Sequence, residues 1–199
     1  MSVSSVGAVA ADAGDLPRQR RTLILGTRLA LAANTTFQLS MIFAYLYLRA
    51  NNFNGGWRPD GIADLSGLPT AIILVLQLAC LGAVVVAAGA ARRGSGARAI
   101  AALALLLAIA SLALRWWYQY HLGDGWLIND GTYAATSMLW FGVLIVEVLF
   151  GCFWLLSVVA PGPRGRDREA TANHLRAFAE YWGYLLVLCA LVFVLVRLV

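Results

Sequence analysis

Charged residues are scarce in this chain of 199 residues, and lysine is absent. Charged side chains make up 13% of the residues and hydrophobic ones 61%, whereas an average soluble domain carries roughly 25% charged residues. Long apolar runs take the place of the alternating pattern that a water-facing fold requires. The composition therefore excludes a soluble globule and predicts an integral membrane protein.

Histidine and cysteine are also rare. The only histidines, His121 and His174, fall outside the apolar runs. Because haem in a helical bundle typically needs histidine ligands within the spans, we expect that the chain itself binds neither haem nor copper. Cys80, Cys152 and Cys189 each lie in an apolar run without CxxC spacing. This placement indicates buried apolar side chains rather than a disulfide framework or a thiolate metal site.

The positive net charge does not point to nucleic acid. All fifteen basic residues are arginines, and most of them lie between apolar runs. Arginines in such positions set the orientation of membrane helices. The arginines therefore do not indicate a nucleic-acid partner, and we expect none. Because histidine and cysteine are so scarce, we also expect no metal site and no catalytic residue in this chain.

Five apolar runs are long enough to cross about 30 Å of hydrocarbon as helices with a rise of 1.5 Å per residue. No proline interrupts any of them. The expected fold is an all-α bundle of five transmembrane helices over residues 22–199, preceded by a disordered basic tail at residues 1–21. The spans are expected at about residues 22–48, 69–91, 97–120, 133–160 and 177–197.

Arginine is distributed unevenly between the two ends of the spans. The tail, the turn between the second and third spans, and the loop at residues 161–176 carry three, three and four arginines. The opposite ends carry Arg49, Arg58, Arg115 and Arg197. Because loops rich in basic residues stay in the cytoplasm, we expect a cytoplasmic amino terminus and a carboxyl terminus outside, in the cell inner (plasma) membrane.

Glu147 is an acidic residue near the middle of the fourth span, where an uncompensated carboxylate is costly. Counted from the ends of their spans, Glu147 and Asn34 both fall near the midplane of the bilayer. We therefore expect Asn34, Thr35 or Gln38 to be a partner of the carboxyl group. Two interpretations stay open: a protonated or hydrogen-bonded structural residue, or a group that takes part in proton movement or in binding a headgroup or partner.

Other charged residues have plainer interpretations. Arg164, Arg166 and Arg168 are expected to set topology, with binding of phospholipid headgroups as a second role. Glu180 is expected in the first turn of the fifth helix, where the helix dipole favours a carboxylate.

Three segments follow one another with a recognisable order and spacing. They are Tyr118-Gln119-Tyr120-His121 at the end of the third span, Asp130-Gly131-x-Tyr133-x-x-Thr136 with Gly142 and Gly151 along the fourth, and Tyr181-Trp182-Gly183-Tyr184 in the fifth. Together they resemble subunit III of the haem–copper cytochrome c oxidases in its short, five-helix bacterial form. That family carries Q-x-x-E-Y, S/D-G-x-Y-G-S and Y-W-H-F-V-D segments in the same order.

The resemblance covers roughly residues 22–199 and implies an accessory, cofactor-free subunit of a terminal oxidase in aerobic electron transport. Such a subunit packs with catalytic subunit I and subunit II, binds phospholipids in its helical clefts, and supports the stability and proton uptake of the catalytic subunit. Haem and copper are then expected in a partner subunit. A structural role is implied for Asp130, Gly131, Tyr133, Thr136, Gly142, Gly151, Tyr181 and Trp182.

The chain departs from this family at its polar positions. The family's glutamate in the first helix falls on Asn34, and its His-x-x-His falls on Leu144 and Glu147. The histidine and aspartate of Y-W-H-F-V-D fall on Gly183 and Leu186. Compared with the family, this chain therefore lacks an acidic residue in the first helix and has one in the fourth. A divergent branch, such as the subunit III-like protein of nitric oxide reductase systems or a subunit of a lineage-specific oxidase, stays open.

Two other classes of protein also stay open. A small proton or cation transporter would use Glu147 as its ion site, but many transporters have broken helices, and no proline interrupts a span here. A membrane enzyme would need a nucleophile with a base beside it, and the spans contain no histidine.

Overall fold

The computed structural model of the chain describes residues 4–52, 57–58, 67–123, 131–160 and 168–198. Within these ranges it contains no strand and five helices, which are α1 (Ser4–Ala50), α2 (Gly67–Arg93), α3 (Ala97–Gly123), α4 (Thr132–Val159) and α5 (Arg168–Leu198). Each of the five is long and apolar enough to cross a membrane. The predicted all-α class with five membrane-spanning helices is confirmed at this level, and the chain is a multi-pass membrane protein.

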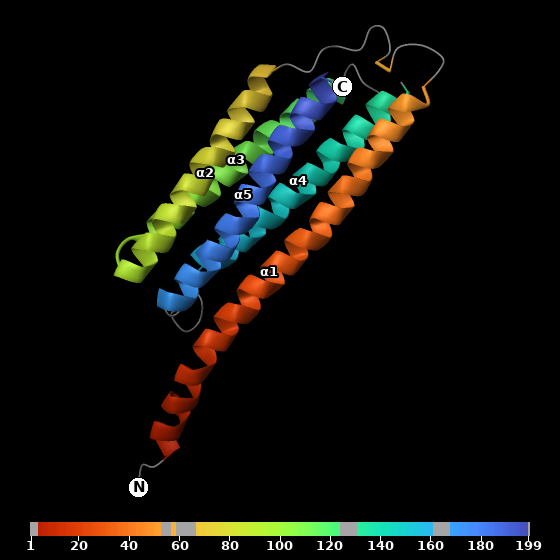
Figure 1. The fold of residues 1–199 in the computed structure, drawn as a ribbon. Helices are drawn as coiled ribbons and strands as arrows, with labels where there is room; N and C mark the ends of the chain where they lie inside the picture. The colour runs from red at the N-terminus through yellow and green to blue at the C-terminus, as the bar shows by residue number, and fades with distance from the viewer. Residues whose placement is uncertain (1–3, 53–56, 59–66, 124–130, 161–167, 199) are drawn as a thin grey trace.

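Two helices begin earlier than the sequence predicts. α5 begins at Arg168 rather than near residue 177, and Glu169 lies in its first turn, where a carboxylate complements the helix dipole. Glu180 therefore lies about three turns inside α5, so its predicted place in the first turn is wrong. α1 begins at Ser4, where a disordered tail was expected. Alanine-rich sequence favours helix there, and α1 extends past the other four helices (Figure 1).

The turn between α2 and α3 is three residues long. Gly94 and Gly96 have φ angles of 75° and 64°, a backbone conformation that glycine adopts at little cost and other residues adopt rarely. The amide N–H of Gly94 donates to the carbonyl of Ala91, which closes the end of α2. This turn makes α2 and α3 antiparallel neighbours.

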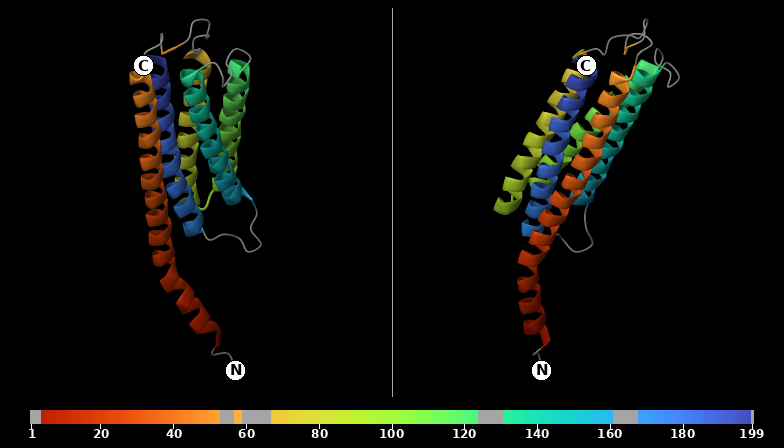
Figure 2. Two further views of the ribbon diagram at one scale, coloured as in Figure 1. Left: turned by 90° about the vertical axis from the view of Figure 1, so that its right-hand side faces the viewer. Right: turned by 45° about the vertical axis from the view of Figure 1, so that its right-hand side comes forward.

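The helices pack as a bundle of four with α1 at its side. α2 contacts α3 and α5, and α4 contacts α3 and α5, whereas α1 contacts only α5 and α4 among the described helices (Figures 1 and 2). Small residues bring α2 and α3 close together, which is the usual means of helix packing in lipid. They include Ala87, Ala91, Ala101, Ala104 and Ala108, all buried. The large buried rings come from α1, α4 and α5 instead, with Tyr45, Trp140, Phe178 and Trp182.

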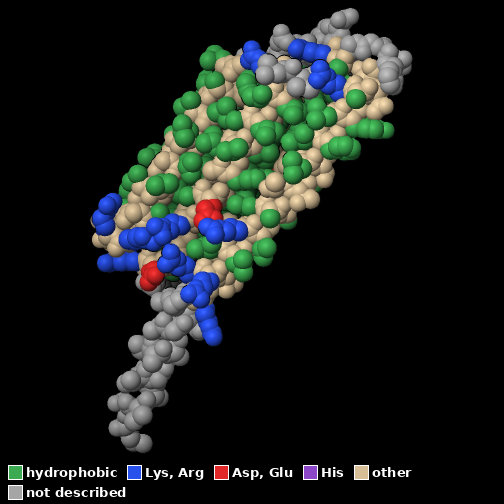
Figure 3. Space-filling view, viewed as in Figure 1, with side chains coloured by type: hydrophobic (Ala, Val, Ile, Leu, Met, Phe, Trp, Pro, Cys, Tyr) green, Lys and Arg blue, Asp and Glu red, His purple; other side chains and the backbone are tan. Residues whose placement is uncertain are grey.

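The surface carries an apolar band between two charged ends (Figure 3). Arginines gather at the end where α2 stops and α3 and α5 start, at Arg92, Arg93, Arg98, Arg168 and Arg176. Arg115 does not belong to the opposite charged end, where the sequence places it, because it is only 7% exposed and lies inside the bundle. Its long side chain turns toward α5 rather than toward the membrane surface.

Candidate functional site

The centre of the candidate site is Glu147 on α4. Asn34 Nδ2 donates to Glu147 Oε1 at 2.7 Å, and Gln38 Nε2 donates to the same oxygen at 2.9 Å. Asn34 and Gln38 are four residues apart and therefore share one face of α1. The predicted contact is present for both residues. The exposed hydroxyl of Thr35 donates instead to the carbonyl of Leu31 at 2.8 Å.

Two further aromatic residues complete this polar cluster. Trp140 Nε1 donates to Gln38 Oε1 at 3.0 Å, and both side chains are at most 2% exposed. The Tyr181 hydroxyl donates to the backbone carbonyl of Glu147 at 2.6 Å. The cluster thus joins α1, α4 and α5. Sequence reasoning missed Trp140, although its position seven residues before Glu147 places it on the same face of α4.

The two oxygens of the Glu147 carboxyl group have different surroundings. Oε1 accepts both amide hydrogen bonds, whereas Oε2 is buried and has no hydrogen-bond partner among the described residues. The donors on Oε1 lower the cost of holding the group in the bundle. Oε2 is left as the atom that can take up or release a proton.

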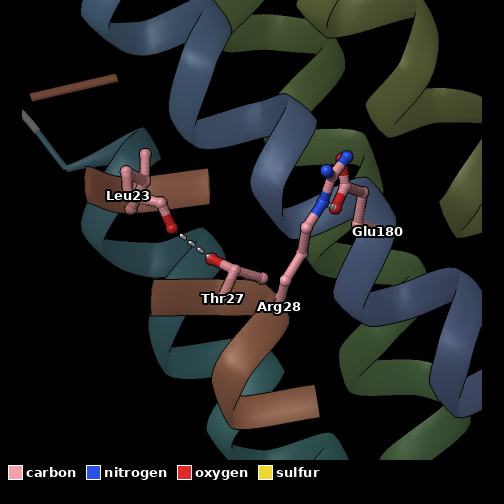
Figure 4. Close-up of polar contacts among 4 residues, drawn as sticks. All are labelled: Leu23, Thr27, Arg28 and Glu180. Atoms are coloured by element: carbon pink, nitrogen blue, oxygen red, sulfur yellow. Dashed lines mark hydrogen bonds and ion pairs between the residues drawn. The ribbon is translucent and has the colours of Figure 1, made fainter. Parts of the chain in front are cut away.

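A second polar contact ties α1 to α5 closer to the arginine-rich end. Arg28 Nε and Nη2 lie 3.1 and 3.2 Å from Glu180 Oε2 and Oε1, a bidentate pair on the bundle surface (Figure 4). In the preceding turn of α1, the Thr27 hydroxyl donates to the Leu23 carbonyl at 2.9 Å. A paired carboxylate and guanidinium are stabilised by the low dielectric near lipid. Sequence reasoning missed this pair because it treated Glu180 alone.

The opposite end of α1 is held by aromatic side chains. Tyr45 is almost fully buried, and its ring centroid lies 5.7 Å from that of Trp140. Trp57 Nε1 donates to the Tyr45 hydroxyl at 3.1 Å. α1 is therefore attached to the bundle at three heights, and the Glu147 cluster is the middle attachment.

The residues that carry the family resemblance are mostly packing residues in the structure. A Cβ atom added to Gly151 would lie 2.6 Å from the ring of Trp182, so α4 and α5 approach closely there. The Tyr133 hydroxyl donates to the Val196 carbonyl at 3.3 Å near the carboxyl end of α5. Gly131 precedes α4 with a φ of 118°, which favours glycine.

Two motif residues of α4, Thr136 and Gly142, do not pack between helices in this way. The Thr136 hydroxyl donates to the Thr132 carbonyl of its own helix at 2.7 Å, and a Cβ atom at Gly142 would meet nothing within 4 Å. Asp130 lies outside the described residues.

Of the three candidate headgroup arginines, Arg168 falls at the turn between α2 and α3. Arg168 lies against this turn, since a Cβ atom on Gly94 would be 2.6 Å from its Nη1. Arg168 and Arg98 border a groove of about 560 Å³ whose other walls come from the ends of α2 and α4. Two guanidinium groups at the end of a membrane span suit an anionic headgroup. Arg164 and Arg166 lie outside the described residues.

The described residues include no group of three or more His, Cys, Asp or Glu side chains placed to hold a metal ion. The three cysteines are free and buried, which confirms their interpretation as buried side chains. No protein-family model matches the chain, and no curated protein matches it. The site is therefore interpreted from its own geometry.

Proposed function

We propose that this chain is an accessory, cofactor-free subunit of a haem–copper terminal oxidase in aerobic electron transport, located in the cell inner (plasma) membrane. The main support is the packing of the motif residues on α4 and α5. Gly151 meets Trp182 at the middle of α5, and Tyr133 meets Val196 near the carboxyl end of α5. The residues that carry the resemblance to subunit III thus lie where they fix one helix pair.

The Glu147 cluster gives this subunit a defined contribution. Asn34 and Gln38 hold α1 against α4 by hydrogen bonds. Such bonds are important in lipid, where the hydrophobic effect contributes little to the association of helices. The free Oε2 of Glu147 is a proton-binding atom in the middle of the bundle. Such a cluster can support the stability and proton uptake of a catalytic subunit that holds the haem and copper.

A surface for that partner is available on α1. Small residues line an exposed strip beside the face of α1 that packs on the bundle, at Gly26, Ala30, Ala33, Ser40 and Ala44, with Phe37 between Ala33 and Ser40. Small side chains allow a neighbouring helix to approach closely, which is how helices associate in membranes. Phospholipids are the second proposed partner, at the groove beside Arg98 and Arg168.

The proposal is tested by purifying the tagged chain from its native membranes in a mild detergent. We expect a haem-bearing catalytic subunit to copurify, visible as a reduced-minus-oxidised haem spectrum. The identity of that subunit decides between an oxidase and a nitric oxide reductase system. Recovery of the chain in good yield, free of any haem-bearing protein, would overturn the proposal.

A small proton or cation transporter is the second candidate function. It is favoured by the carboxyl oxygen of Glu147 that is buried without a hydrogen-bond partner in the described part of the chain. It requires ion flux when the protein is reconstituted alone in liposomes, together with the loss of that flux in Glu147→Gln. The accessory-subunit proposal expects no such flux.

A further inference from the structure

Arg115 on α3 is a buried charge that the Glu147 cluster does not use. It is 7% exposed, and its Nη2 lies 3.1 Å from the sulfur of Cys189. Its Nε has no hydrogen-bond partner among the described residues. A guanidinium group stays charged in proteins, and a charge at this depth in a bundle normally has a counter-charge.

The described carboxylates do not supply that counter-charge directly. Glu147 interacts with Arg115 only through space, because Asn34 and Gln38 hold its carboxyl group toward α1. The ion pair found in the described part of the chain is Arg28 with Glu180. The sulfur of Cys189 is a weak hydrogen-bond acceptor. The positive charge of Arg115 is therefore uncompensated at contact distance.

A cavity of about 30 Å³ lies beside this guanidinium group, between α2, α3, α4 and α5. Its walls are mostly apolar and include Leu144 and Phe141. Thr70, whose hydroxyl group can donate a hydrogen bond, also lines it. A water molecule needs about 10–15 Å³ of such space, so the cavity can hold two water-sized occupants. A halide ion is larger than a water molecule, and the cavity can hold one such ion in place of the two waters.

Gln119 lines the same cavity, and its Oε1 is buried without a hydrogen-bond partner among the described residues. An anion alone would not satisfy this acceptor. Gln119 also lines a second, wider groove together with Trp116 and Tyr120. A water molecule on that side can satisfy its Oε1 while the anion occupies the cavity beside Arg115.

We propose that this cavity binds a small monovalent inorganic anion, such as chloride, as the counter-charge of Arg115. The size of the cavity excludes gluconate and sulfate. The cavity lies next to the Glu147 cluster, since Leu144, which lines it, is one turn before Glu147 on α4. The proposal does not depend on the proposed function of the chain.

The test uses the full-length chain, purified in detergent in a chloride-free gluconate buffer and titrated with sodium chloride or sodium bromide at constant ionic strength. We expect the midpoint of thermal unfolding to rise saturably with either halide, since a ligand of the folded state stabilises it by mass action. Broadening of the ³⁵Cl resonance should report chloride binding directly. Sulfate should give no saturable rise, because it stabilises folded proteins by exclusion from their surface rather than by binding at a site.

Arg115→Gln should abolish the halide dependence of both measurements, whereas Arg49→Gln, at an exposed arginine of α1, should preserve it. Thr70→Leu keeps Arg115 but narrows the cavity, and it should weaken halide binding at least tenfold if Arg115→Gln does not fold. An equally saturable response to halide and sulfate in the unchanged protein, or an equal halide response in Arg115→Gln and Arg49→Gln, would overturn the proposal and assign water alone to the cavity.

Discussion

Two amides on α1 donate to one oxygen of Glu147, and this arrangement separates the structural role of the residue from a chemical one. Glu147→Gln keeps a carbonyl oxygen for Asn34 and Gln38, so we expect its stability to stay within about 1 kcal/mol of the unchanged protein. Glu147→Leu leaves two amide groups without their acceptor, and we expect a loss of about 1–3 kcal/mol. Reversible unfolding in mixed micelles measures both values.

The same pair of variants tests the proton-binding role of the free oxygen. If Oε2 exchanges a proton, Glu147→Gln lowers turnover of the assembled complex while its stability is kept. Equal turnover in Glu147→Gln and in the unchanged complex would leave the residue with a structural role only. Equal stability in Glu147→Leu would remove the structural role as well.

Gly151 and Gly142 lie on one helix but have different surroundings, which makes them a matched pair. A Cβ atom at position 151 would approach the ring of Trp182, which is fully buried and has no room to move aside. We expect Gly151→Ala to destabilise the protein by about 1–3 kcal/mol through overpacking. Gly142→Ala meets open space and should be neutral or slightly stabilising, since alanine favours helix. Similar unfolding midpoints for the two variants would contradict this close packing of α4 and α5.

Depth along a helix can be predicted from the sequence, but rotation about its axis cannot. A rise of 1.5 Å per residue placed Asn34, Thr35 and Glu147 at one height. Which of the candidates contacts Glu147 depends on how α1 is rotated against α4, because adjacent residues point about 100° apart. Asn34 and Gln38 face inward, and Thr35 does not. The contact of Arg115 with Cys189 depends in the same way on how α3 is rotated against α5, and it was missed for the same reason.

At the scale of the helix, the small-residue strip of α1 provides a test of partner binding. Ala33 belongs to this strip, whereas the neighbouring Ala32 is equally lipid-exposed but points about 100° away. We expect Ala33→Leu to reduce the haem-bearing protein recovered with the tagged chain by at least half, because leucine prevents close approach of another helix.

Ala32→Leu is the control for this experiment, since it adds the same side chain to the same helix. It should leave the amount of copurified haem unchanged. Equal recovery in both variants, with both chains folded, would show that the partner does not pack on this strip.

Hydropathy located the five helices but not their ends. The segment from Arg168 to Arg176 is polar and was predicted as a loop, yet it forms the first turns of α5. Alanine and arginine favour helix regardless of polarity, so an apolar window underestimates the length of the helix. Because of this error, Glu180 was predicted in the first turn of α5, and its ion pair with Arg28 was not predicted.

At the scale of the whole molecule, the arginines define two unequal ends of the bundle. The burial of Arg115 inside the bundle removes one arginine from the end that was already poorer in basic residues. The bias that sets orientation is counted over loops and helix ends, so the expected orientation becomes better supported when Arg115 is left out. Five spans then place the two termini on opposite sides of the membrane.

Reporter fusions test this orientation directly. Alkaline phosphatase fused after Val199 should be active, because it folds outside the cytoplasm, and the same enzyme fused after Ser95 in the turn between α2 and α3 should be inactive. Green fluorescent protein should give the opposite pattern at the two sites. The physical reason is that Arg92, Arg93 and Arg98 flank the turn and resist transfer across the membrane. Active phosphatase at Ser95 together with inactive phosphatase at the carboxyl terminus would mean that the bundle is inserted the other way. The groove beside Arg98 and Arg168 would then lie outside the cell, away from the anionic lipids of the cytoplasmic leaflet.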